Sequence, residues 1–126
     1  RFGCFILDGF KEEGKGPAVP PGWFQDISAA KYSVGARALH PDNFVSNFGY
    51  ESGWWTTARG GKEYMMGDDG AFAAMGMYGQ SIYIVPKLDA VIAIQSGYPE
   101  HDLDLFTRNA ELANAILKAL RQSDKS

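Results

Sequence analysis

The most regular hydrophobic pattern lies at the C-terminal end of the chain. Apolar residues recur there at alternating steps of three and four, which places them on one face of an α-helix. Asp102 is a candidate N-cap, and Asp104 adds negative charge to the first turn, where the helix dipole favours it. Lys118 and Arg121 suit the opposite end for the same reason. The pattern predicts a helix across a sheet, with its stripe formed by Leu103, Phe106, Ala110, Ala113, Leu117 and Leu120.

Three short apolar segments precede this helix and predict β-strands. They are "AFAAM" (71–75), "SIYIV" (81–85) and "AVIAIQS" (90–96), and tight connections separate them. Strands joined in this way are expected to pair as an antiparallel meander. Polar residues hardly alternate with apolar ones along them, so both faces of the sheet should be covered.

An aromatic segment, "FGYESGWWTT" (48–57), predicts further strand structure, with Gly49 and Gly53 as bends. Successive residues of a strand face opposite sides of a sheet. One of Trp54 and Trp55 should therefore pack in the core, while the other could line a cleft.

The N-terminal residues predict the tail of an amphipathic helix over positions 1–8. Phe2, Phe5 and Ile6 fall on one face of this helix, and Gly9 is its expected stop. Because the apolar face is already in phase at the first residue, we expect the beginning of this helix to lie upstream of the chain.

The remaining segments predict loops and turns. Residues 11–22 are rich in glycine and proline, residues 23–31 can form a short helix, and residues 32–47 have no clean period. Residues 59–63, "RGGKE", predict a hairpin turn, and the adjacent carboxylates of "GDDG" (67–70) fit a polar turn. The expected fold class is α+β, an antiparallel meander backed by the C-terminal helix.

Composition narrows the possible functions of these 126 residues. The 12 basic and 15 acidic residues give a net charge of −3 without a basic cluster, which argues against nucleic-acid binding. The longest apolar run, at positions 90–94, is far too short to span a membrane. Cys4 is alone and is expected to be a small buried residue. His40 and His101 lack ligand spacing, so we expect neither a metal nor a cofactor.

Two segments carry candidate chemistry. The turn "GMYGQ" (76–80) joins two predicted strands, and a free backbone amide there could stabilise a developing oxyanion. A simple hairpin turn explains the same residues. "SAAK" matches the S-x-x-K pattern of a serine nucleophile and its lysine, at Ser28 and Lys31. No long buried helix follows to hold that pair rigid, and a chance match explains it.

Four stretches together resemble a known family. They are "RFGCFILDGF", "VPPGWFQDIS", "FGYESGWW" and "FAAMGMYGQSIYIVPKLDAVIAIQS", in this order over residues 1–120. They are similar to the C-terminal part of serine β-lactamase and penicillin-binding-protein-like hydrolases. The similarity is greatest to the class C-related branch, which includes esterases and 6-aminohexanoate-oligomer hydrolases.

The resemblance implies that residues 1–126 are the C-terminal portion of such a domain. The family's S-x-x-K and Tyr-x-Asn motifs would lie upstream, so the nucleophile would be outside the chain. Gly76, Met77 and Tyr78 match the strand and turn that border the family's active site, with the Met77 N–H as oxyanion donor. No lysine or histidine triplet stands at positions 73–77, which favours ester or amide substrates over β-lactams. A bacterial periplasmic or secreted location is also implied.

Two hypotheses remain open at this point. In the first, the chain supplies the oxyanion wall of a serine hydrolase, is inactive alone, and associates with the missing N-terminal part or with itself. In the second, the chain is a non-catalytic binding or interaction module that keeps the fold. An apolar patch and an open sheet edge would favour the first.

Overall fold

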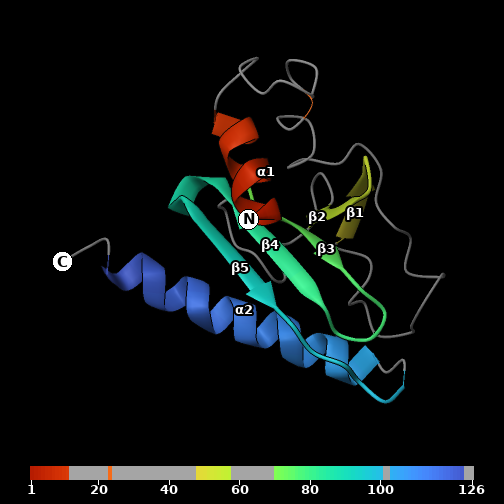
Figure 1. The fold of residues 1–126 in the computed structure, drawn as a ribbon. Coiled ribbons are helices and arrows are strands. Elements are labelled where there is room, and N and C mark those ends of the chain that lie inside the picture. Colours follow the sequence, from red (N-terminus) through yellow and green to blue (C-terminus); the bar gives the residue numbers. More distant parts are fainter. Residues whose placement is uncertain (12–22, 24–47, 58–69, 101–102, 124–126) are drawn as a thin grey trace.

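A computed structural model describes residues 1–11, 23, 48–57, 70–100 and 103–123. Within these residues the chain forms one antiparallel sheet whose strands follow each other in sequence order, as Figure 1 shows. The predicted meander and the α+β class are therefore confirmed. The strands are β1 (Phe48–Glu51), β2 (Trp54–Thr57), β3 (Phe72–Met75), β4 (Ser81–Val85) and β5 (Ala90–Ile94).

Two helices lie on opposite faces of this sheet, α1 (Phe2–Lys11) and α2 (Leu103–Ser123) (Figure 1). Strand alternation divides the core between them. Phe72 and Ile84 pair across β3 and β4 and pack on the α1 side. Their neighbours Ala73 and Tyr83 also pair, and they pack on the α2 side. The prediction that both sheet faces are covered is confirmed for these strands.

The first two strands form a tight hairpin over Ser52 and Gly53. These turn residues have φ values of 51° and 88°, the positive angles that two-residue hairpins with the twist of the sheet require. The bend predicted at Gly53 is confirmed. Gly49 was expected to be another bend, but it lies within β1 and pairs with Thr56. The turn predicted at 59–63 lies outside the described residues.

The connection between β4 and β5 is a short 3₁₀ helix, η3 (Pro86–Leu88). Proline fixes the first φ angle, and Asp89 ends the turn in the left-handed region at φ 49°. The Asp89 N–H donates to the Pro86 carbonyl over 3.2 Å. This connection places β5 beside β4 in register.

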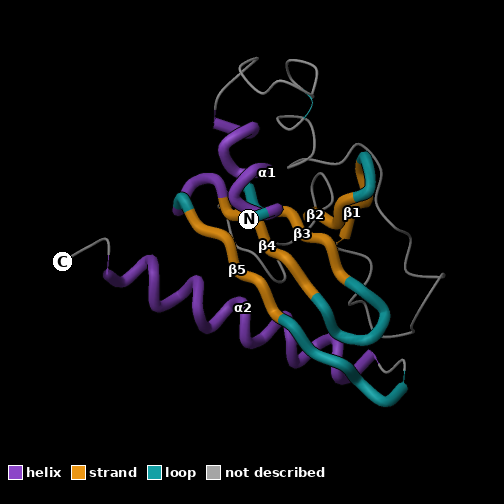
Figure 2. The backbone as a smooth tube through the Cα atoms, viewed as in Figure 1, coloured by secondary structure: helices purple, strands orange, loops and turns teal. Residues whose placement is uncertain are grey.

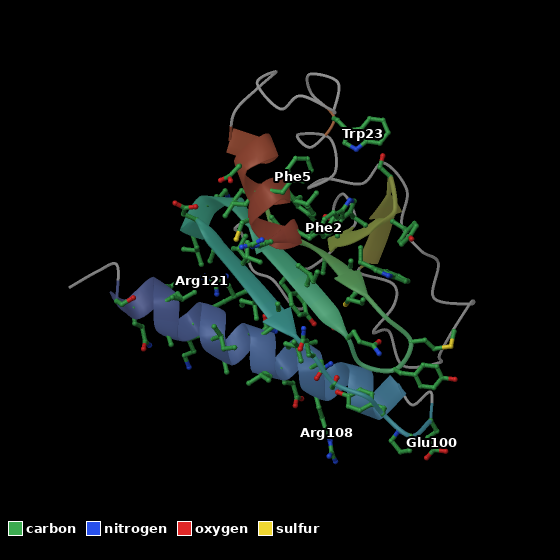
Figure 3. All side chains as sticks on the ribbon, in the orientation of Figure 1. Phe2, Phe5, Trp23, Glu100, Arg108 and Arg121 are labelled. Atoms are coloured by element: carbon green, nitrogen blue, oxygen red, sulfur yellow. The ribbon has the colours of Figure 1, made fainter. Side chains whose placement is uncertain are left out.

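Helix α1 differs from its prediction in length and in the side it buries. It continues through Gly9 to Lys11, so Gly9 does not stop it. Ile6 and Leu7 are buried, whereas Phe2 and Phe5 are 57% and 43% exposed. Figure 3 shows both phenylalanines on α1, on the far side of the sheet from α2.

The cause of this orientation is Gly3. A Cβ atom at Gly3 would collide with Cγ1 of Val91 and lie 3.2 Å from Cγ2 of Ile82. The backbone of α1 therefore approaches the sheet most closely at Gly3, and bulkier side chains must flank that contact. Cys4, the next residue of the helix, is exposed, which contradicts its expected burial.

Helix α2 packs through the predicted stripe. Ala110, Ala113 and Leu117 are at most 2% exposed and contact the α2 side of the sheet. Leu120, about one turn after Leu117, is 36% exposed, so the stripe is no longer buried at that end of the helix. Asp102 and the side chains of residues 103–107 lie outside the described residues.

Candidate functional site

The candidate site is the turn between β3 and β4, residues 76–80. The Gly76 N–H donates to the Gln80 carbonyl over 2.7 Å, and the Gly79 N–H donates to the Gly76 carbonyl over 3.1 Å. Gly79 has a φ of 92°. A three-residue loop that ends in a left-handed residue has this pattern of hydrogen bonds. The simple hairpin turn expected from the sequence is therefore present, with Met77 and Tyr78 at its tip.

The hydrogen bonding of the turn leaves two backbone donors without acceptors. Neither the Met77 N–H nor the Tyr78 N–H has an acceptor among the described residues. In a trans peptide the C=O and the N–H point in opposite directions. Because the Gly76 carbonyl points into the turn toward Gly79, the Met77 N–H points out of it. The side chains of Met77 and Tyr78 are 62% and 47% exposed.

The chain segment that follows β5 forms hydrogen bonds with this turn. The Tyr98 N–H donates to the Tyr78 carbonyl over 3.0 Å. Ser96 Oγ and Asn109 Nδ2 each donate to the Gly79 carbonyl over 2.5 Å. Figure 2 shows the β3–β4 turn beside the loop that leaves β5. Residues from β5 to α2 thus bind two successive carbonyls of the turn.

Asn109 connects these interactions. It is 7% exposed on α2, and Tyr98 Oη donates to its Oδ1 over 2.6 Å. A neutral amide that is almost completely buried needs partners for both its donor and its acceptor. Asn109 has both, because its Nδ2 binds Gly79 and its Oδ1 binds Tyr98.

A second buried polar group lies at the base of the turn, on the α2 face of β4. Tyr83 is fully buried and its Oη lies 3.9 Å from Met75 Sδ. Burial raises the pKa of the Tyr83 phenol, because the charged phenolate would be desolvated. Its hydrogen bond with Ser81 lowers the pKa, and the nearby Tyr98 raises it further. Tyr83 is therefore a neutral structural group at ordinary pH and no candidate for a base.

The two tryptophans of β2 face opposite sides of the sheet, as expected. Trp54 is buried on the α1 side, and its ring lies edge-on to Phe72 at 5.1 Å and stacked on Phe2 at 6.3 Å. Trp55 is half-buried, packs on the α2-side core and lies edge-on to Tyr50 at 5.1 Å. Trp54 is thus the tryptophan that enters the core.

The structure brings Gly76, Met77 and Tyr78 together in one turn, while Ser28, Lys31 and residues 67–69 lie outside the described residues. Sequence reasoning missed the polar residues that hold the turn, Ser96, Tyr98 and Asn109. One signal for Asn109 was available. It directly precedes Ala110, a member of the buried stripe, and an amide beside a buried stripe needs a partner.

Among the described residues, no group of His, Cys, Asp and Glu side chains could hold a metal ion. Neither described helix combines the length and the apolar character that a bilayer span demands.

Comparison with known proteins finds a partial similarity to a hydrolase. No protein-family model matches it. It is similar to a 6-aminohexanoate-dimer hydrolase from Paenarthrobacter ureafaciens, with 30% identity over 106 residues. The match covers 81% of this chain but 24% of the hydrolase, so the chain spans only part of the length of that relative.

Proposed function

We propose that the chain is the C-terminal portion of a β-lactamase-like serine hydrolase, of the class C-related and esterase branch, and that it supplies the oxyanion wall of the active site. The Met77 N–H is the oxyanion donor, and Gly76 and Tyr78 border the substrate. The observation that carries this proposal is the outward N–H of Met77, which has no acceptor in the described structure, in a turn held by hydrogen bonds. The similarity to a hydrolase supports the class of reaction.

The proposed reaction is the hydrolysis of an ester or amide through an acyl-enzyme. A serine from the missing N-terminal portion attacks the carbonyl carbon, and the carbonyl oxygen gains negative charge. A preorganised N–H stabilises that charge because it needs no reorientation as the charge develops. The chain alone is inactive in this proposal, since an oxyanion donor without a nucleophile has no reaction to accelerate.

Exposed aromatic side chains support a surface that another part of the protein covers. Phe2 and Phe5 on α1 and Trp23 are each at least 43% exposed. Large exposed apolar side chains can mark an interface with another part of a protein. The edge strands β1 and β5 each have one strand partner among the described residues, and an open edge can pair with a further strand.

Two experiments test this proposal. The first determines the coding sequence upstream of Arg1, and the second mixes the upstream portion with this chain and assays the pair. We expect S-x-x-K and Tyr-x-Asn motifs upstream, and turnover of a nitrophenyl ester when the upstream portion is mixed with this chain. Absence of both motifs, or no turnover from a folded and associated pair, would contradict the proposal. Labelling of the isolated chain by a fluorophosphonate, abolished in Ser28→Ala, would assign the nucleophile to Ser28 instead.

A second candidate is a non-catalytic binding or interaction module. It is favoured by the cover that the chain's own helices give to both faces of β3, β4 and β5. Analytical ultracentrifugation separates the two candidates. A monomer at all concentrations that does not bind the upstream portion favours the module, whereas self-association or binding of that portion favours the hydrolase.

A further inference from the structure

The turn that holds the proposed oxyanion donor depends on a residue that lies thirty positions beyond Gly79 in the sequence. Asn109 Nδ2 donates to the Gly79 carbonyl over 2.5 Å, and this contact joins helix α2 to the β3–β4 turn. Ser96 Oγ donates to the same oxygen, and the Tyr98 N–H donates to the preceding carbonyl, that of Tyr78. Three donors from residues 96–109 therefore converge on two neighbouring peptide groups.

The geometry of the peptide groups transmits this contact to Met77. The peptide group between Tyr78 and Gly79 is fixed at both ends, because its carbonyl accepts from Tyr98 and its N–H donates to Gly76. The Gly76 carbonyl belongs to the same rigid plane as the Met77 N–H. Whatever holds Gly79 in place therefore sets the direction of the Met77 N–H.

Asn109 is suited to this role because it is nearly completely buried and held at both polar atoms. Its side chain is 7% exposed, and Tyr98 Oη donates to its Oδ1 over 2.6 Å. Tyr98 thus acts on the turn twice, through its own N–H and through the orientation of the Asn109 amide. Gly79 admits this close approach, since a Cβ atom there would collide with the Tyr98 ring.

We propose that Asn109, oriented by Tyr98, is a positioning residue that holds the β3–β4 turn so that the Met77 N–H keeps one direction. Its effect on catalysis rests on the proposed function, whereas the rigidity of the turn does not. A positioning residue differs from an ordinary packing residue in the region that its loss affects. Losing a packing residue lowers the stability of the whole fold, while losing Asn109 also frees residues 77–80 in the folded state.

The experiment measures backbone ¹⁵N order parameters of the folded chain. In the unaltered protein we expect residues 77–80 to have order parameters of about 0.85, which is typical of rigid backbone. Asn109→Leu keeps a side chain of similar size and removes both hydrogen bonds, and we expect values at 77–80 to fall below about 0.6. Tyr98→Phe removes only the hydroxyl donor, so we expect an intermediate decrease.

Leu117→Ala is the matched control. Leu117 is fully buried on the same helix and packs on the same face of the sheet, but it is not part of the hydrogen bonds to the turn. We expect Leu117→Ala to lower the melting temperature and to leave the order parameters of 77–80 unchanged. A folded Asn109→Leu variant with a rigid turn would overturn the proposal. If Asn109→Leu does not fold, Asn109→Ala, which also removes both hydrogen bonds of the amide, is measured in its place, and a rigid turn in that folded variant would overturn the proposal.

A second readout applies to the reconstituted enzyme. With Asn109→Leu, we expect kcat for a nitrophenyl ester to fall by about 10-fold to 100-fold with little change in KM, because misplacement of a group that acts in the transition state lowers kcat. A rise in KM of the same size, with kcat unchanged, would overturn the positioning role. If the unaltered pair shows no turnover, the proposed function fails, and the order parameters alone decide whether Asn109 holds the turn.

Discussion

Two glycines with similar backbone angles differ in their surroundings and allow the packing around the β3–β4 turn to be measured. Gly79 has a φ of 92° and Gly53 has a φ of 88°. A Cβ atom at Gly53 would have no heavy atom within 4 Å, whereas at Gly79 it would meet the Tyr98 ring and lie 2.6 Å from Ser96 Oγ. Alanine at either position has the same backbone penalty, and only Gly79→Ala adds a steric one.

The expected magnitudes follow from these two effects. A left-handed conformation costs alanine about 1–2 kcal/mol, and the smaller freedom of the unfolded chain returns about 0.4–1 kcal/mol. Gly53→Ala should therefore lower the free energy of unfolding by about 1 kcal/mol. Gly79→Ala must also displace Tyr98 or Ser96, and overpacking of this kind costs about 1–3 kcal/mol more.

The assay is chemical denaturation of both variants followed by circular dichroism, with thermal melting as a second measure. A difference of about 1–3 kcal/mol corresponds to a melting temperature lower by at least about 4 °C for Gly79→Ala than for Gly53→Ala. Equal destabilisation of the two variants would refute the reasoning, because it would mean that Tyr98 and Ser96 do not pack against Gly79 in solution.

Three further predictions concern α1 and the core. Gly3→Ala should destabilise the protein, although alanine favours helices by about 1 kcal/mol relative to glycine, because its Cβ atom would collide with Val91. In a double-mutant cycle, adding Val91→Ala should recover part of the lost stability, and full additivity of the two changes would contradict this contact. Cys4 should react with a chromogenic disulfide reagent in the native protein, because it is exposed, and reaction only after denaturation would contradict its position. The phenol of Tyr83 has a raised pKa when folded, so the folded state retains the proton longer than the unfolded chain. Its contribution to stability should be constant below the ordinary phenol pKa of 10.0 and decrease as pH rises above it, by up to about 1.4 kcal/mol per pH unit. An alkaline slope unchanged in Tyr83→Phe would contradict this.

Hydrophobic periodicity predicted most of the fold because it records which side of each element is covered. Ala110, Ala113 and Leu117 recur at helical spacing, and they are the residues that α2 buries. Periodicity failed on α1 for a physical reason. Phe2 and Phe5 are large apolar residues, but the closest contact with the sheet is made through Gly3, a residue without a side chain. A search for apolar side chains cannot detect a contact made by backbone.

The candidate site was predictable only at its tip. The glycines of "GMYGQ" marked a turn, and the resemblance pointed to Met77 within it. The residues that give the turn its rigidity are polar and lie 16 or more positions downstream, and their spacing follows neither helix nor strand period. Ser96 and Tyr98 precede α2 in a segment that resembles an ordinary surface loop. Their hydrogen bonds with the turn depend on the position in which the end of β5 places them, and the register of the whole meander sets that position.

This dependence gives the C-terminal helix a specific place in the proposed chemistry. The N–H of Met77 can stabilise charge only if its direction is fixed before the reaction, because reorientation would consume the stabilisation. A hairpin tip does not have a fixed direction by itself, since the peptide group between Met77 and Tyr78 makes no hydrogen bond among the described residues. The Asn109 amide supplies the missing constraint from a helix that is held by its own apolar stripe. Changes that shift α2 along the sheet should therefore alter the turn, whereas changes on its exposed side, such as Leu112→Ala, should not.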